Sequence, residues 1–533
     1  MKRTRLLRNI MLTASLGVLA SCNIYDVIRP SSSDSSPGSS QATSSKSHTS
    51  TEGGELERTD VLPFSLREVS LSTRADVLPS EGDLELLLLP IEFTDSPFTQ
   101  QTLKDIEIAV NGTPEETNYW ESVSSFYDKS SFGKSHLHYT IADVYSTGMT
   151  QRQVYEASKD SSGETDNAAG VIGDAYQAYL KKNGNTSTQK FDSDKNGWID
   201  GVVAVYSGHN YTQMRNTYDQ DGFYWAYTYW TVGSYDEAWT QPNVNCPTPN
   251  VYIWLSYDFF YNSKSKGVDA HTLIHETGHM YGLDDYYSKT GACLAGGHAM
   301  MDENVVDHDA YSKMMLGWTK PYIADQTGTI NITPSQEGGD CILIPSENWN
   351  GTAYDDYLLL ELYTPTGLNY LDSHTVYENH DKKAYSVAGI KLYHVDSRLV
   401  EIRQTATSKS YSYMANPDSG MKENTRTEAY GYMVAASNCY KSDWKMSGYS
   451  TDFALLHMIE ADGTADFVYG RTGENDDLFT KGSFSMNNST FRKFFNKRDS
   501  KGHALLNSGL TVPYSIFFDE VTDEGATILI EDM

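Results

Sequence analysis

The sequence predicts an α+β fold in which a mixed region of helices and strands precedes a β-rich, sandwich-like C-terminal region. Three observations predict it. Helices and strands alternate up to about residue 325, an amphipathic helix lies near the middle of the chain, and short strands separated by turn residues follow. A chain of 533 residues is long enough for more than one domain. We expect the first region to cover residues 79–325 and the second to cover residues 326–533.

Apolar periodicity places the individual elements. A dense apolar run at residues 83–93 is typical of a buried opening strand. Helices are expected at 102–110, 115–129 and 167–181, and further strands of the first region at 135–145 and 201–210. Strands of the second region are expected at 329–333, 341–345, 357–363, 390–395, 511–518 and 526–530.

Residues 218–260 are crowded with aromatic side chains. They include Tyr224, Trp225, Tyr227, Tyr229, Trp230, Trp239, Tyr252 and Trp254. Such clusters can line a substrate groove or stack on sugars, but more often they are strand residues of a core. We expect the core role here.

One stretch directly after this segment has the spacing of metal ligands. His275 and His279 are four residues apart, so on a helix they share one face and can share one metal ion. Gly282 can adopt a left-handed conformation, which ends the helix and brings Asp285 round as a third ligand. Three protein ligands leave one zinc position open for water, as in catalytic zinc sites. Asp284 is the alternative third ligand, although its spacing is one residue short.

Other side chains near this stretch have expected supporting roles. Glu276, between the two histidines, is expected to point toward the water at the open position. Met301, or else Met300, is expected to pack beneath the ligands without binding the metal, and the acid after Met301 favours it. Three more histidines are expected to support the site or to lie on the surface: His271, His298 and His308.

A second metal pattern lies at residues 191–200. The expected ligands are those of positions 1, 3, 5, 7 and 9 of a calcium loop, namely Asp192, Asp194, Asn196, the backbone carbonyl of Trp198, and Asp200. Position 12, which usually supplies a bidentate Glu, is Val203. Either a remote carboxylate completes the shell or the affinity is weak, and the alternative is an Asx-rich turn without metal. We expect this ion to be structural.

The N-terminus predicts export and a lipid anchor. Residues 1–21 combine a basic start with a short apolar stretch, as in a secretory signal peptide. The sequence Leu-Ala-Ser-Cys ending at Cys22 resembles a bacterial lipobox, in which that cysteine is lipidated; the alternative is ordinary cleavage that leaves a plain thiol. Residues 22–78 are expected to be a Ser-rich tether followed by a segment whose role as a removable pro-segment is left open.

Charge and cysteine content limit the partners. The formal net charge of −30 makes nucleic acid an improbable partner, because phosphate binding needs a basic surface. Four cysteines remain beside Cys22 and would allow up to two disulfides with three connectivities in an exported protein: Cys246, Cys293, Cys341 and Cys439.

Several segments together resemble a known family. They read LLLLPIEFTD, SFYDKSSFGK, FDSDKNGWID, HETGHMYGLDD and AMMDENVVDHDAYSKMMLGWTKP, with DYLLLELY and GIKLYHVD further on. The chain resembles the M6 metallopeptidases, the immune inhibitor A-like secreted bacterial zinc proteases, over roughly residues 80–400. The resemblance implies a metzincin-like fold, zinc-dependent endopeptidase activity, secretion and a supporting calcium site. Two departures are the missing last acid of the calcium loop and the absence of a Tyr two residues after the methionine.

The expected function is therefore that of a lipid-anchored zinc endopeptidase. We expect a monomer that cuts extracellular proteins at the extracellular face of the bacterial cytoplasmic membrane, with shedding or secretion as the alternative. Glu276 would take a proton from the attacking water and pass it to the leaving amine. The alternative from another class is a non-catalytic adhesin or glycan-binding lipoprotein that retains a protease fold.

Overall fold

The computed structural model describes residues 56–72, 76–159, 165, 167–184, 188–231, 240–289, 291–439 and 453–533. The expected signal peptide, Cys22 and the Ser-rich stretch up to residue 55 lie outside the described residues. Within the described chain, the strands form several sheets and helices lie between them in sequence, which confirms a mixed α+β fold. No helix among these residues is both long enough and apolar enough to cross a membrane.

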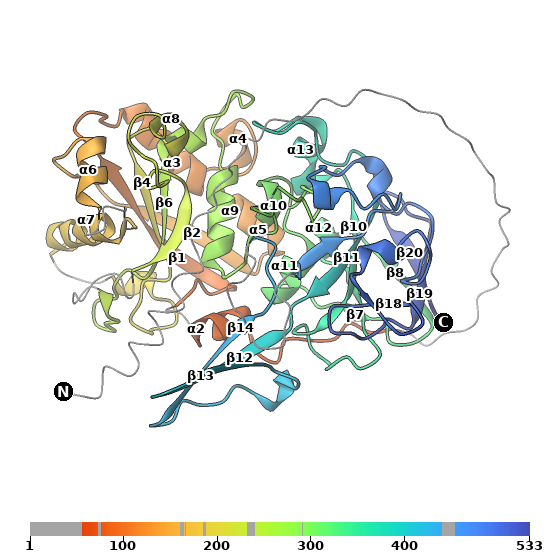
Figure 1. The fold of residues 1–533 in the computed structure, drawn as a ribbon. Helices are drawn as coiled ribbons and strands as arrows, with labels where there is room; N and C mark the ends of the chain where they lie inside the picture. The colour runs from red at the N-terminus through yellow and green to blue at the C-terminus, as the bar shows by residue number, and fades with distance from the viewer. Residues whose placement is uncertain are drawn as a thin grey trace.

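A six-stranded sheet organises the first region (Figure 1). Its strands are β1 (Gly82–Glu92), β2 (Ser135–Ile141), β3 (Tyr145–Ser146), β4 (Val202–Tyr206), β5 (Tyr227–Trp230) and β6 (Val251–Ser256). The order is β2-β1-β4-β6-β5, with β3 beside β1. All neighbours are parallel except β5, which pairs antiparallel with β6 at one edge. The expected strands at 83–93, 135–145 and 201–210 are therefore present.

Helices cover both faces of this sheet, which explains why β1, β4 and β6 are apolar on both sides. One face packs against α3 (Gln100–Asn111), α5 (Val123–Ser130) and α9 (His271–Met280). The other face packs against α6 (Gln151–Ala157) and α7 (Ala169–Lys182). The aromatic segment contributes to the core as expected, because Tyr224, Tyr252 and Trp254 are fully buried between the sheet and the helices α6 and α7. Trp239 lies outside the described residues.

The prediction of a single helix at 115–129 is wrong. The structure has a short helix α4 (Pro114–Thr117) and then α5, with a break between them. Asn118 follows α4 in the left-handed conformation, with φ of 55°, and Ser122 caps α5 by accepting from the amide of Ser125. Local capping therefore outweighs the helical periodicity across this stretch.

The second region is a pair of sheets. One contains β7 (Tyr322–Ile323), β9 (Cys341–Ile344), β10 (Asp356–Tyr363), β11 (Gly389–Asp396) and β15 (Leu456–Met458). The other contains β8 (Gly328–Ile332), β16 (Gly482–Phe484), β19 (Tyr514–Asp519) and β20 (Ala526–Asp532). Apolar side chains from both sheets form one core cluster, so the two sheets pack face to face as expected. Smaller strands are β12 (Leu399–Thr405), β13 (Lys409–Tyr413), β14 (Glu428–Val434), β17 (Lys497–Arg498) and β18 (Ala504–Leu505).

The two regions share a core. Alternate side chains of β9 and β10 point to opposite faces: Ile342 and Leu358 join the sandwich core, while Leu343 and Leu359 join the cluster that contains α9. Short helices lie near this junction or on the first region, namely α8 (Tyr211–Met214), α10 (Met300–Glu303), α11 (Ala310–Met315), α12 (Ser335–Gly338) and α13 (Tyr370–His374). The sandwich therefore supports the layer that carries α9.

Residues 56–72 and 76–78 form a segment that we call the N-terminal strap. It contains α2 (Leu66–Leu71) and crosses both regions before β1. The amide of Thr59 donates to the carbonyl of Pro321, the residue before β7. The amide of Leu78 donates to the carbonyl of Met280, at the end of α9. Several of its apolar side chains are buried, so the strap is an integral part of the packed structure.

Shortening a buried side chain of the strap should destabilise the whole protein. Leu78 is fully buried, so Leu78→Ala should lower the free energy of unfolding by about 2–5 kcal/mol. The matched control is Leu71→Ala in the same strap, where the side chain is exposed and the change should stay within about 0.5 kcal/mol. Denaturant unfolding monitored by tryptophan fluorescence measures both; equal effects would mean that the strap does not belong to the core.

Candidate metal centre

The helix α9 and the turn after it bring together the three side chains expected as zinc ligands. One donor atom from each of His275, His279 and Asp285 lies within 4.8 Å of the others. The Oδ1 atom of Asp285 is 3.2 Å from Nε2 of His275 and 3.0 Å from Nε2 of His279. Two imidazole nitrogens and one carboxylate are a donor set that suits zinc, so these residues fit that ion.

Gly282 makes this convergence possible. Its φ of 94° is strained for any residue with a Cβ atom, and it turns the chain directly after α9. The amide of Leu283 then donates to the carbonyl of Gly278, which closes the helix end. Asp285 follows three residues after the glycine and folds back onto the face that carries the histidines.

Backbone carbonyls orient both histidine rings. Nδ1 of His275 is 2.8 Å from the carbonyl oxygen of Met300, and Nδ1 of His279 is 2.9 Å from that of Leu283. A carbonyl only accepts, so each Nδ1 carries the proton and donates it. Nε2 is then the ring nitrogen that faces Asp285, and it is the atom that would bind a metal on loss of its proton.

The same cluster is strongly coupled electrostatically. Burial lowers the pKa of His279, but the facing Asp285 carboxylate outweighs burial and raises this pKa to about 10. Burial raises the pKa of Asp285, and the two imidazoles reverse this effect and hold that pKa well below its usual range. The Asp285 carboxylate thus favours a positive charge at the imidazoles that face it.

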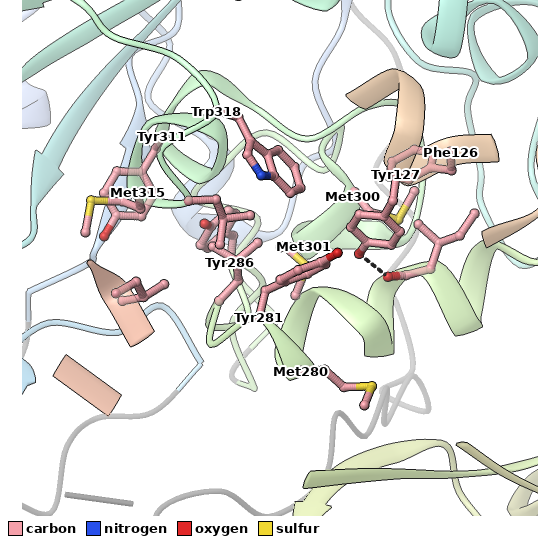
Figure 2. Close-up of a cluster of buried hydrophobic side chains, with 14 of the residues drawn as sticks. Phe126, Tyr127, Met280, Tyr281, Tyr286, Met300, Met301, Tyr311, Met315 and Trp318 are labelled. Carbon is pink, nitrogen blue, oxygen red and sulfur yellow. Dashed lines mark hydrogen bonds between the residues drawn. The ribbon is translucent and has the colours of Figure 1, made fainter. Parts of the chain in front are cut away.

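The two methionines expected near the site have different roles (Figure 2). The side chain of Met301 packs against α9 so closely that a Cβ atom on Gly278 would lie 2.3 Å from its sulfur. Met300 contributes its carbonyl, which orients His275. Tyr127 fixes the same helix from another side by donating to the carbonyl of Ile274 at 2.7 Å.

Glu276 lies on α9 between the two histidines and is buried. The hydroxyl of Thr228, on the edge strand β5, donates to Oε2 of Glu276 at 3.1 Å and to its backbone carbonyl at 2.8 Å. The edge of the sheet is therefore tied directly to the carboxylate expected to carry the proton.

A segment of the second region covers the site, and the sequence did not predict it. The side-chain amide of Asn438 donates to the carbonyls of Tyr286 and Leu456, both at 2.7 Å. Burial raises the pKa of the neighbouring Cys439 thiol, and the charges of Asp285 and Asp284 raise it further, so this thiol faces the site. Asn438 and Tyr286 are 152 residues apart in the chain, so no local pattern could have indicated their contact.

Tyr287 is a second residue that the sequence did not single out. Its ring lies over His275 with the centroids 6.3 Å apart and the planes nearly parallel. The pKa of the Tyr287 hydroxyl lies well above its usual range. Burial is the largest cause, and the charges of Asp285, Cys439 and Glu276 raise this pKa further. A neutral hydroxyl donor therefore faces the metal centre.

The remaining histidines have other partners, and of the cysteines Cys439 lies beside Asp285. His271 bonds to Asp269, His298 to the carbonyl of Gly473, and His308 to the Tyr127 hydroxyl. Cys246, Cys293, Cys341 and Cys439 are all free thiols, so the disulfides that were left open do not form in this structure.

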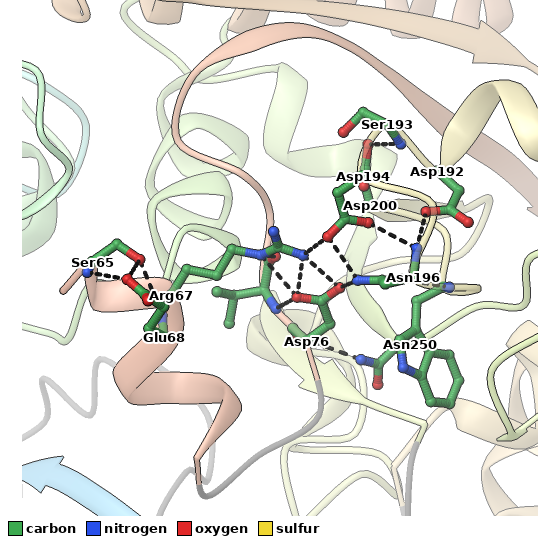
Figure 3. Close-up of polar contacts among 12 residues, drawn as sticks. Ser65, Arg67, Glu68, Asp76, Asp192, Ser193, Asp194, Asn196, Asp200 and Asn250 are labelled. Carbon is green, nitrogen blue, oxygen red and sulfur yellow. Dashed lines mark hydrogen bonds and ion pairs between the residues drawn. The ribbon is translucent and has the colours of Figure 1, made fainter. Parts of the chain in front are cut away.

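The second candidate site has the local geometry of a cation loop (Figure 3). Oxygen atoms of Asp192, Asp194 and Asp200 lie within 4.8 Å of one another. The Asp192 carboxylate accepts from the amides of Asn196 and Gly197, at 3.0 and 2.9 Å, and folds the loop around this point. The Trp198 amide is held by Oδ1 of Asn196 at 2.8 Å.

The charge of this loop is only partly compensated. Burial raises the pKa of Asp200 to about 7, and its Oδ1 atom is buried without a hydrogen-bond partner. Burial also raises the pKa of Asp192. Val203, at position 12, is fully buried in β4 and supplies no ligand. Carboxylates and amide oxygens are ligands that calcium prefers, so the residues present fit that ion.

Comparisons of the chain with protein-family models and with curated proteins give no match. The case for both centres therefore depends on the residues and their geometry.

Replacing Asp285 should remove zinc binding, whereas replacing its neighbour should not. Asp285→Asn removes the carboxylate that faces both Nε2 atoms, so zinc affinity should fall by more than the roughly 10–100-fold typical of an outer partner. Asp284→Asn is the matched control, because Asn retains the Oδ1 atom that accepts from the Asp285 amide. Zinc titration against a competing chelator measures both variants, and a larger loss in the Asp284 variant would reverse the assignment.

Proposed function

We propose that the protein is a zinc-dependent endopeptidase with a metzincin-like catalytic region of the kind found in the M6 metallopeptidases. The observation that carries the proposal is the convergence of His275, His279 and Asp285 beside Glu276, all on one buried helix and its following turn. This is the side-chain chemistry required for hydrolysis of a peptide bond with a metal-activated water.

The proposed reaction assigns Glu276 to proton transfer. When bound by these ligands, zinc supplies a Lewis acid that makes water more acidic and polarises a carbonyl. Glu276 accepts the proton of the attacking water and delivers it to the leaving amine. Thr228 orients the carboxylate through its hydroxyl, and the hydrogen bonds from Nδ1 of His275 and His279 keep their Nε2 atoms available.

An extended peptide is the substrate class that the sheet edge favours. Among the strands that the structure describes, β5 is the last in its sheet and pairs with β6 on one side. A peptide in the extended conformation can add to such an edge through its main chain. Because Thr228 of β5 contacts Glu276, a peptide bound along β5 would pass beside the proton carrier. Extracellular proteins are the proposed substrates.

The proposed location is the outside of the cell membrane. The basic and apolar residues 1–21 and the lipobox-like sequence ending at Cys22 support export and lipid attachment. The Ser-rich residues that follow would hold a monomeric enzyme away from the lipid surface. Calcium in the loop at residues 192–200 is proposed as a structural ion.

Glu276→Gln tests the enzymatic proposal. The amide cannot accept the proton, so hydrolysis of a casein substrate should fall by about 100- to 10,000-fold, the range of general acid–base catalysis. Zinc content should remain at the wild-type level, because Glu276 is not among the three clustered ligands. Glu107→Gln, an exposed change on α3, serves as the control and should keep full activity. Unchanged activity of the Glu276 variant would reject the mechanism.

A further inference from the structure

The N-terminal strap contacts the calcium loop through one arginine (Figure 3). The Nη2 atom of Arg67 lies 2.6 Å from Oδ2 of Asp194 in the loop, and 2.7 and 2.8 Å from the two carboxylate oxygens of Asp76 in the strap. The Nε atom of Arg67 also donates to the carbonyl of Val77 at 2.9 Å. One guanidinium group thus joins both parts of the strap to position 3 of the loop.

Asp76 adds a second contact between the strap and the loop. It is almost fully buried, and its carboxylate accepts from the side-chain amide of Asn196, at position 5 of the loop. The same amide donates to Oδ2 of Asp194 at 3.0 Å. Arg67, Asp76, Asp194 and Asn196 therefore form a closed ring of polar contacts, half from the strap and half from the loop.

The same strap also holds the turn of the zinc centre. A Cβ atom on Gly282 would lie 3.2 Å from Oγ of Ser70 and 3.6 Å from Cγ of Leu66, so α2 packs directly on this turn. The amide of Leu78, two residues after Asp76, donates to the carbonyl of Met280 at 2.8 Å. Both contacts lie next to the residues that place His279 and Asp285.

A divalent cation in the loop would act on residues that the strap also contacts. Asp192, Asp194 and Asp200 bring three carboxylates together, and Oδ1 of Asp200 is buried without a partner. A divalent ion would remove their mutual repulsion and fix Asp194 and Asn196. Arg67 pairs with Oδ2 of Asp194, so Oδ1 of the same carboxylate can face the ion while this pair is kept. The ion therefore favours the docked strap.

We propose that the strap couples the two metal centres, so that calcium in the loop at residues 192–200 tightens zinc binding by His275, His279 and Asp285. Calcium orders the loop, the ordered loop holds Arg67 and Asp76, and the strap then supports the Gly282 turn that carries Asp285. This inference rests on the proposed zinc site. Linkage requires the effect to be reciprocal, so zinc tightens calcium binding by the same factor.

The test is a zinc titration of the full chain with and without calcium. Calcium should lower the zinc Kd of the wild type by about tenfold, within the 5–150-fold range typical of coupled sites. In Arg67→Gln the effect should fall below about twofold, because the link to Asp194 is lost. Arg58→Gln is the matched control: it removes an arginine of the same strap that pairs with Asp340, far from the loop in sequence, and should retain the full effect.

Hydrogen exchange gives a second measurement that needs no substitution. Calcium should slow amide exchange within residues 56–78 of the wild-type protein, including the Leu78 amide. The same zinc Kd with and without calcium would overturn the coupling while leaving the proposed enzyme intact. Full coupling in Arg67→Gln, or unchanged exchange in the strap, would show that the strap does not carry it. A wild type that binds no zinc at all would overturn the proposed function and this inference together.

Discussion

The carboxylate of Asp285, held between two imidazoles, is the interaction on which the candidate site depends. Its Oδ1 atom lies 3.0 and 3.2 Å from the two Nε2 atoms, in an environment where an unpaired charge would be costly. Three separate features hold this geometry: the left-handed Gly282, the carbonyl of Met300 and the carbonyl of Leu283. Each feature acts on a different donor, so the protein's own backbone positions all three donors.

Local features of this arrangement could be predicted from the sequence. The histidine spacing on α9, the glycine after it and the acidic positions of the loop at residues 192–200 all act within about a dozen residues. Most strands were also predictable, because their apolar side chains are continuous or alternate. The break at Asn118 was missed, since a capping hydroxyl at Ser122 competes with the helical period there. Whether this layered region is metzincin-like stays a proposal.

Contacts between distant segments could not be predicted. Arg67 meets Asp194 across 127 residues, and Asn438 meets Tyr286 across 152. Nothing in the sequence around Arg67 distinguishes it from a solvated surface arginine. The strap shows why this matters for function. Residues that the sequence predicted to be a tether before β1 instead contact the loop, the end of α9 and the second region.

The segment at residues 434–439, next to the metal centre, and the three candidate ligands are held by different contacts. The side chains of His275 and Asp285 are at most 6% exposed, and the Cys439 thiol of the segment at residues 434–439 lies beside Asp285. That segment is held by Asn438 and by the Ser437 hydroxyl on Asp284. The ligands are oriented from the opposite direction, by backbone carbonyls of their own region. The contacts that hold this segment are therefore separate from the carbonyls that orient the two histidines.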